Sequence, residues 1–181
     1  MKKWIVAVLL SSSVFCYADT ITGRVVGVTD GDTIKVLDAS NTEYKIRLAG
    51  IDAPEKKQAF GQVSKKSLSD LVFDKQVTVD WNKQDRYGHT IGKVLVNGVD
   101  ANLEQVKRGM AWFYKKYQNE LLLQDRLDYL HAQEFAEKER IGLWAGNMLA
   151  SSNVASLFSY RSIAYKSPTQ HKLQSNSLIK R

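Results

Sequence analysis

The sequence is poor in cysteine and in long apolar runs. Cys16 is the single cysteine among 181 residues, and it lies in an N-terminal segment that we expect to be removed. Disulfide bonds are therefore excluded as a source of stability. The apolar run from Trp4 to Leu10 is shorter than the roughly 20 residues that a transmembrane helix needs. A chain of this length is long enough for one domain that is held together by packing alone.

The first 18 residues have the pattern of a secretory signal peptide. Lys2 and Lys3 form a charged start, an apolar run follows, and Ala18 supplies the small residue that precedes a cleavage site. The alternative is an uncleaved membrane anchor, for which the apolar run is short. We therefore expect residues 1–18 to be removed, and the protein to be exported to a periplasm or out of the cell without a membrane attachment.

The expected folded part also lacks an excess of charge. The formal net charge is +7, but seven of the 26 basic residues lie in the signal segment or beyond residue 160, where acidic residues are absent. The other 19 basic residues are balanced by 19 acidic ones. Basic side chains must therefore act by position. Residues 151–181 lack periodicity and predict a basic tail of low order, either simply solvated or adding weak, salt-sensitive attraction to nucleic acid.

Two short motifs place carboxylates and a guanidinium near one point. The first is Asp-Gly-Asp-Thr at residues 30–33, and the second is Arg-Leu-Ala-Gly-Ile-Asp-Ala-Pro-Glu at residues 47–55. Between them, residues 32–37 and 43–48 alternate with a period of two around a turn-like segment, which predicts a β-hairpin. This hairpin makes Asp32 a neighbour of Arg47, with Asp52 a few residues beyond.

The carboxylates suit a metal ion of the hard, oxygen-binding kind. Pro54 favours an extended conformation at Ala53, so that the carbonyl oxygen of Ala53 can point sideways. Together with Asp32 and Asp52 it makes an all-oxygen pocket of the type that Ca²⁺ prefers, with water in the remaining positions. The alternative for the first motif is an ordinary Asp-Gly turn whose carboxylates accept main-chain hydrogen bonds.

Glu55 and Arg47 complete the chemistry of phosphodiester hydrolysis. Glu55 can orient and deprotonate a water molecule, and Arg47 offers a planar fork that matches two phosphate oxygens. Each also has a purely structural interpretation. Glu55 can begin a helix, where a carboxylate is favoured by the helix dipole, and Arg47 can form a cross-strand ion pair with Asp32 or Glu43.

Periodicity and turn residues predict the remaining elements. Strands are expected at 21–28, 77–81 and 90–96 and helices at 60–72, from Asp100 or Asn102 to Gly109, and from an Asn119 cap to about Arg140. Two glycines in the first strand suggest a bulge. In the last helix we expect an inward stripe of Leu123, Leu127 and Leu130 and a partly buried, structural His131. The pattern predicts an α+β fold, a five-stranded OB-fold-like β-barrel with three helices, within a domain at residues 19–150.

These motifs, in this order, resemble the staphylococcal nuclease (thermonuclease) family. Further matches are Asp-Arg-Tyr-Gly-His at 85–89, Gly-Met-Ala-Trp at 109–112 and Gly-Leu-Trp at 142–144, so the resemblance runs from about Ile21 to about Trp144. It implies the same barrel fold. It also implies a calcium-dependent nuclease, expected to be a monomer, that hydrolyses single-stranded or frayed DNA and RNA with little sequence choice and leaves 3′-phosphates.

The resemblance also implies roles for individual residues. Asp32, Asp52 and the Ala53 carbonyl would hold calcium, Glu55 would act as general base, and Arg47 would stabilise charge on the phosphate. Tyr87 would stack on a base or hydrogen-bond a phosphate, with Tyr117 assisting. Packing in the barrel is the alternative for both tyrosines. A rival function is a non-catalytic nucleic-acid-binding module of the same fold, against which the retained acidic residues argue.

Position 89 departs from the family pattern, which usually has a second arginine there. His89 carries a full charge only below a pKa of about 6.5 when it is unperturbed. It can donate a hydrogen bond to phosphate or protonate the leaving oxygen, but it cannot form the two parallel hydrogen bonds that a guanidinium makes to phosphate. The alternative is that His89 is an exposed loop residue and that Arg86 reaches over in its place.

Overall fold

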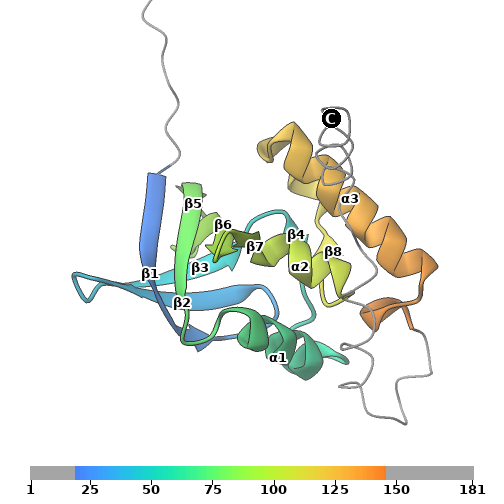
Figure 1. Cartoon of the computed structure of the whole chain (residues 1–181), viewed down its shortest axis with the longest axis horizontal. Helices are drawn as coiled ribbons and strands as arrows, with labels where there is room; N and C mark the ends of the chain where they lie inside the picture. Colours follow the sequence, from blue (N-terminus) through green and yellow to red (C-terminus); the bar gives the residue numbers. More distant parts are fainter. Residues whose placement is uncertain (1–18, 146–181) are drawn as a thin grey trace, which may run out of the picture.

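The computed structural model describes residues 19–145. The expected signal peptide 1–18 and the expected tail 151–181 lie outside the described residues. In chain order (Figure 1) the elements are β1 (Asp19–Val28), β2 (Thr33–Asp38), β3 (Glu43–Leu48), β4 (Ile51–Asp52), α1 (Gly61–Val72), β5 (Gln76–Gln84), β6 (Thr90–Val96), β7 (Val99–Asp100), α2 (Ala101–Lys107), β8 (Trp112–Phe113), η1 (Lys115–Glu120), α3 (Leu123–Lys138) and η2 (Gly142–Trp144).

Five strands close into a barrel. The sheet has the order β3-β2-β1-β5-β6-β7, and an additional parallel pairing of β3 with β6 joins its two sides. Along this seam Ile46 lies opposite Thr90, and Arg47 lies opposite Ile91. The fold is therefore the α+β, OB-fold-like barrel with three α-helices that the sequence predicts, and the seam brings the end of the β2–β3 hairpin beside the start of β6.

The expected bulge in the first strand is present. The register of β1 against β2 shifts between Val25 and Gly27, and β5 has a second irregularity against β6 between Trp81 and Lys83. Such bulges increase local twist and help a short sheet to curve into a barrel. Alternate residues of β6 are buried, as expected for a strand with one face toward the core.

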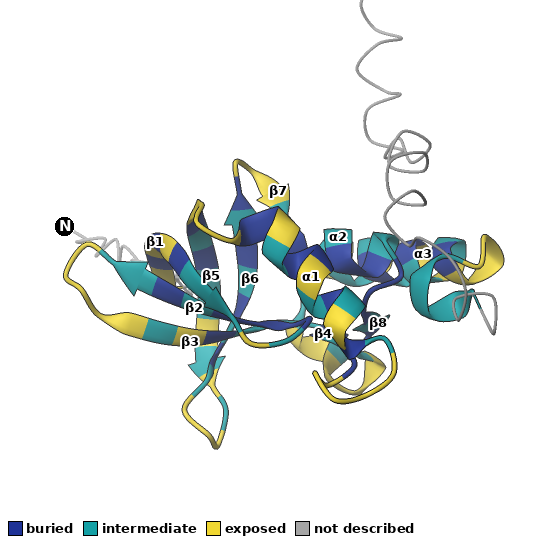
Figure 2. Cartoon of the chain, turned by 90° about the horizontal axis from the view of Figure 1, so that it is seen from below, coloured by how far each residue is buried: buried dark blue, intermediate teal, exposed yellow. Residues whose placement is uncertain are grey.

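The core fills the barrel and continues beneath the helices (Figure 2). In the cartoon α2 lies between the barrel and α3 (Figure 1), and it packs against β6, α1 and α3. Asp100 caps α2, accepting a 3.0 Å hydrogen bond from the amide of Leu103, which is one of the two caps that the sequence offers. Between residues 19 and 145 no helix is both long enough and apolar enough to cross a membrane.

The last helix differs from the prediction in where it begins and in which face it buries. It starts at Leu123, because Asn119 lies in η1, where its side-chain oxygen accepts a hydrogen bond from Arg126 rather than from a main-chain amide. The buried residues are Tyr129, Ala132 and Ala136. Alanine allows a close approach to α2, and this contact outweighs the hydrophobicity of the leucine stripe.

The prediction is therefore wrong for Leu123 and Leu127 and for the partial burial of His131, whereas Leu130 packs against the core as predicted. Leu123 is 61% exposed and Leu127 is 39% exposed, and Leu130 is only partly buried. His131 is exposed, because successive helix residues point about 100° apart and the buried face of α3 is made by Tyr129, Ala132 and Ala136.

Candidate active site

The loop between β1 and β2 is held in place by hydrogen bonds and by close packing at Gly31. Asp30 accepts a 3.2 Å hydrogen bond from the amide of Asp32, so the turn interpretation of this motif holds for Asp30. A Cβ atom at Gly31 would clash with the side chain of Ser64, so only glycine fits. Buried Gln105 donates a 2.8 Å hydrogen bond to the carbonyl of Gly31. The loop therefore presents Asp32 in one orientation.

The turn between β3 and β4 is held by α2, the helix that also contains Gln105. Gly50 has a φ of +73°, a conformation that favours glycine. Asn102 of α2 donates a 2.9 Å hydrogen bond to the carbonyl of Ala49 and accepts one from the amide of Val94. Because both Asn102 and Gln105 are fully buried, α2 fixes the two chain segments that carry the carboxylates relative to each other.

The three charged residues predicted to converge do so. Arg47 Nη2 lies 2.7 Å from Asp52 Oδ1 and 3.2 Å from Asp32 Oδ2. Asp32 also accepts hydrogen bonds from the amide of Ala53 at 3.0 Å and from the hydroxyl of Thr33 at 2.9 Å. The predicted cross-strand ion pair with Asp32 is thus present, while the alternative partner Glu43 pairs with Lys35.

The carboxyl group of Asp32 is buried, and the positive charge of Arg47 compensates for this burial only in part. Its residue is only 2% exposed. Burial raises its pKa from 3.8 to about 7, and the opposing effect of Arg47 is reduced by the nearby charge of Asp30. For Arg47, burial lowers the pKa, but the carboxylates of Asp32 and Asp52 more than offset this and raise it. A buried carboxyl that the protein itself neutralises incompletely is suited to a bound cation.

The donor set at this point is small. Within residues 19–145 no group of three or more His, Cys, Asp or Glu side chains is arranged to hold a metal ion. Asp32 and Asp52 are the two carboxylates that Arg47 brings together, and Ala53 meets Asp32 through its amide. A cation here would take its other ligands from main-chain carbonyl groups or water, which Ca²⁺ accepts readily.

Glu55 lies beside this cluster and faces open space. It is exposed, and its amide donates a 2.8 Å hydrogen bond to Gln58 in the loop before α1. It lines a cavity of about 960 Å³ together with Arg47, and its charge contributes to the raised pKa of Arg47. Its carboxylate is therefore free to contact water or substrate in the cavity.

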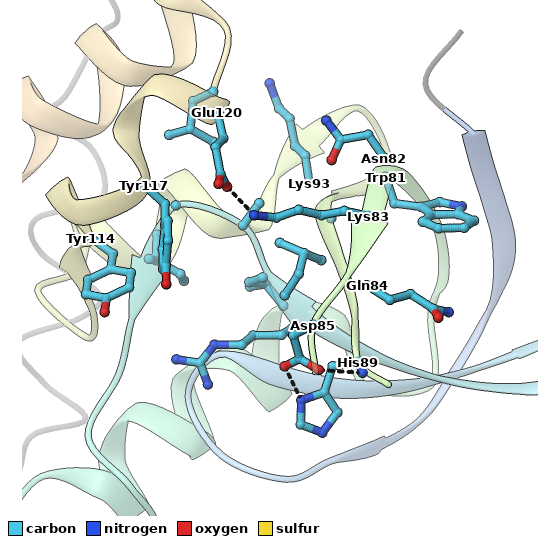
Figure 3. A pocket seen from close by; sticks show the side chains of 18 of the residues that line it. Trp81, Asn82, Lys83, Gln84, Asp85, His89, Lys93, Tyr114, Tyr117 and Glu120 are labelled. Carbon is cyan, nitrogen blue, oxygen red and sulfur yellow. Dashed lines mark hydrogen bonds and ion pairs between the residues drawn. The ribbon is translucent and has the colours of Figure 1, made fainter. Parts of the chain in front are cut away.

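The loop between β5 and β6 forms one wall of the cavity. His89 Nδ1 lies 2.8 Å from Asp85 Oδ2 (Figure 3). The guanidinium of Arg86 lies 4.8 Å from the ring centroid of Tyr87, which is 69% exposed. Arg86 therefore stacks on its neighbour, and the structure does not show it reaching toward the Arg47 cluster. His89 is partly buried, so it is not the fully exposed loop residue of the alternative interpretation.

The opposite wall is formed by Tyr114 and η1, and the side chain of Lys83 in β5 reaches toward it. Tyr117, 44% exposed, meets the ring of Tyr114 edge to face at a centroid separation of 5.3 Å. Lys83 and Lys116 lie 5.1 and 5.5 Å from the Tyr117 ring centroid, and Lys83 pairs with Glu120 across the cavity wall (Figure 3). Sequence reasoning missed Tyr114 and the two lysines. The spacing of three between the tyrosines was the available signal.

The structure thus defines a class: a small OB-fold barrel with paired carboxylates, an arginine and an aromatic cavity at one end. Residues 45–146 match the family model described as staphylococcal nuclease homologue. The chain belongs to the staphylococcal nuclease family. It is accordingly a nuclease, a hydrolase whose substrates are nucleic acids.

Several relatives are similar over most of both chains. An uncharacterized endonuclease of Haemophilus influenzae is 49% identical over 132 residues, covering 73% of this chain and 71% of the relative. An uncharacterized endonuclease of Escherichia coli O157:H7 is 40% identical over 146 residues, which is 80% of this chain and 91% of the relative. A micrococcal nuclease of Shigella flexneri is 40% identical over 148 residues, with 77% and 82% coverage.

Proposed function

We propose that this nuclease is calcium-dependent and hydrolyses DNA and RNA with little sequence choice, leaving 3′-phosphates. The observation that carries the calcium requirement is the buried carboxyl of Asp32, whose pKa is raised to about 7 even beside Arg47. In this proposal Asp32 and Asp52 hold the ion, with the carbonyl of Ala53 and water as further ligands. A calcium ion held there would supply positive charge to bind and polarise the phosphate.

The residues of the chain then divide the work of hydrolysis. Glu55 takes a proton from water as the new bond between oxygen and phosphorus forms. Arg47 donates hydrogen bonds to the phosphate oxygens on which charge accumulates. The bond between phosphorus and the 5′ oxygen breaks. His89, which lines the same cavity, contacts that oxygen as it leaves. The pairing of Arg47 with two carboxylates keeps its guanidinium in place before substrate arrives.

The cavity walls favour unpaired bases as the bound form of the substrate. Tyr87 and Tyr117 are exposed aromatic rings on opposite walls, and Lys83 and Lys116 lie beside one of them. Base stacking on aromatic rings is tolerant of sequence, and basic side chains follow the backbone. We therefore propose single-stranded or frayed nucleic acid as the substrate, bound by a monomer.

We also propose export, to a periplasm or out of the cell, on the pattern of residues 1–18. The rival function, a nucleic-acid-binding module without catalysis, shares the fold and the aromatic walls. The discriminating feature is the set of four polar residues Asp32, Arg47, Asp52 and Glu55, which binding alone does not require.

The proposed function is tested by digesting denatured DNA and single-stranded RNA with residues 19–181, with added calcium or with a chelator. We expect cleavage of both polymers only with calcium, and 3′-phosphate ends on the products. Calcium should also raise the thermal unfolding temperature of the wild type but not of Asp52→Asn, because binding to the folded state alone stabilises it. Cleavage that survives the chelator would contradict the calcium requirement, and binding without cleavage would support the rival module.

His89→Arg is expected to raise activity at alkaline pH. An arginine stays charged at all working pH values, whereas an imidazole is neutral at alkaline pH. The ratio of variant to wild-type rate on denatured DNA should therefore rise between pH 6 and pH 9. Equal rates across this range would show that position 89 takes no part in the reaction.

A further inference from the structure

The side chain that most distinguishes this cavity is His89, and its ring is held by a second residue, Asp85. The carboxylate of Asp85 meets Nδ1 of His89 at 2.8 Å. We propose that Asp85 and His89 act as a proton-donating pair: His89 is the general acid for the leaving oxygen, and Asp85 is the positioning residue that orients its ring through the hydrogen bond at Nδ1. This inference rests on the proposed function, because it concerns the departure of the leaving group in the same reaction.

The geometry fixes the ring from one side only. Asp85 Oδ1 accepts hydrogen bonds from the amides of Tyr87 at 2.8 Å and of His89 at 2.9 Å, and this leaves Oδ2 for the imidazole. The loop is closed by two further main-chain hydrogen bonds, from Asp85 to the carbonyl of His89 and from Gly88 to the carbonyl of Asp85. With Nδ1 occupied, Nε2 is the nitrogen left to meet a ligand.

The position of the ring connects this pair to the cavity. The side chain of His89 is 20% exposed, and it lines the same cavity as Glu55 and Arg47. General base and general acid must approach the phosphate from different sides, since the attacking and leaving oxygens lie in line. In the close-up, the Asp85–His89 pair lies across the cavity from Tyr114 and Tyr117 (Figure 3).

The electrostatics keep the Asp85 carboxylate negatively charged beside the ring. Burial would raise the pKa of Asp85, but hydrogen bonds from the amides of His89 and Tyr87 and from the His89 ring lower it below its usual value. Asp85 therefore remains ionised at neutral pH. The ring of Tyr87 in the same loop lies 6.2 Å from the His89 ring, centroid to centroid, and Arg86 stacks on Tyr87, while Arg47 and Glu55 line the same cavity.

The proton balance of the step is simple. As the bond between phosphorus and the 5′ oxygen breaks, the Nε2 proton of the imidazolium passes to that oxygen and gives a neutral hydroxyl. The imidazole is left neutral, with its Nδ1 proton on the hydrogen bond to Asp85, and it regains a proton from solvent. An arginine at this position could stabilise charge, but it does not release a proton at working pH.

The test uses a leaving group that needs no proton. Two single-stranded DNA oligonucleotides are compared, one with an ordinary linkage at the cleaved position and one with sulfur in place of the 5′ bridging oxygen. A thiolate is a much weaker base than an alkoxide, so it departs without general acid. We expect His89→Ala to lower kcat on the ordinary linkage by about 10²–10³-fold and on the sulfur linkage by less than about tenfold.

Asp85→Asn should show the same selectivity in a milder form. An asparagine side chain can still accept the two main-chain hydrogen bonds through its oxygen, but it no longer places a carboxylate oxygen against Nδ1 of the ring. We expect a loss of about tenfold or more on the ordinary linkage and little loss on the sulfur linkage. A purely structural role in the loop would lower both rates equally.

The chain offers matched controls for both variants. Asp38 Oδ1 accepts hydrogen bonds from the amides of Ser40 and Thr42 in the β2–β3 turn, as Asp85 does in its loop, but no histidine is bound to it. His131 is exposed on α3 and does not line the cavity. Asp38→Asn and His131→Ala should leave both rates near those of the wild type.

The outcomes separate this inference from the proposed function. Equal losses on both linkages for His89→Ala or Asp85→Asn would overturn the proton-donating pair while leaving the nuclease intact. A full rate on the ordinary linkage in either variant would do the same. If the wild type cuts neither oligonucleotide with calcium, the proposed function fails and the pair fails with it.

Discussion

Replacing Glu55 by Gln is expected to lower the rate of phosphodiester cleavage by about 10²–10⁴-fold, the usual contribution of a positioned general base. The amide keeps the size and the hydrogen-bonding reach of the carboxylate but cannot accept a proton from water. Glu55 is exposed, and its hydrogen bond to Gln58 is donated by its main-chain amide and not by its side chain. The variant should therefore fold normally and still bind calcium through Asp32 and Asp52.

The measurement is kcat on denatured DNA with saturating calcium, together with calcium-dependent thermal unfolding to show that the ion still binds. Glu120→Gln is the matched control, because Glu120 lines the same cavity but pairs with Lys83. Loss of that exposed ion pair should change the rate by less than about fivefold, equivalent to about 1 kcal/mol. A Glu55→Gln enzyme with the wild-type rate would remove the general base from the mechanism.

Asp32→Asn is expected to abolish calcium-dependent activity and, in the presence of a chelator, to make the protein more stable at alkaline pH. In the unfolded chain the carboxyl titrates near its ordinary value of 3.8, and in the folded protein near 7. Between these values the folded state binds more protons, so the free energy of unfolding falls as pH rises from about 4 to about 7. The neutral amide escapes this penalty.

We expect a gain on the order of 1–3 kcal/mol at pH 8 and close to none at pH 4. Urea unfolding at both pH values, with chelator throughout, measures it. Asp38→Asn should give no such gain, since hydrogen bonds from Ser40 and Thr42 lower the pKa of Asp38. An Asp32→Asn protein that is less stable than the wild type at pH 8 would show that Asp32 is well paired in the folded state without metal.

The parts of the site that the sequence predicts are those that depend on local geometry. Alternation on both sides of a five-residue turn placed Asp32 beside Arg47, because a short hairpin leaves little freedom in register. The same argument predicted the first three strands and, with the resemblance, the barrel. These predictions are confirmed by the pairing of Thr33 with Arg47 and by the closed sheet.

What the sequence does not predict depends on contacts between distant segments. Leu123 and Leu127 of α3 are exposed, yet Ala132 and Ala136 are buried in this helix, which packs against α2, because close packing of helices favours small residues. Gln105 holds the carbonyl of Gly31, 74 residues away in sequence, and nothing in the helix pattern indicates this partner. The pair of Asp85 and His89 is different. Its spacing of four was visible, but only the loop conformation shows that the side chains meet.

The amides of Asn102 and Gln105 make the catalytic arrangement a property of the junction between the barrel and its helices. Neither residue carries charge or faces the cavity, yet one holds the turn after Arg47 and the other the loop before Asp32. A partly unfolded form that kept the barrel but released α2 would retain every reactive side chain. These side chains would no longer be held close to one another. Heat or denaturant should therefore abolish activity as soon as α2 detaches, even while the strands of the barrel remain paired.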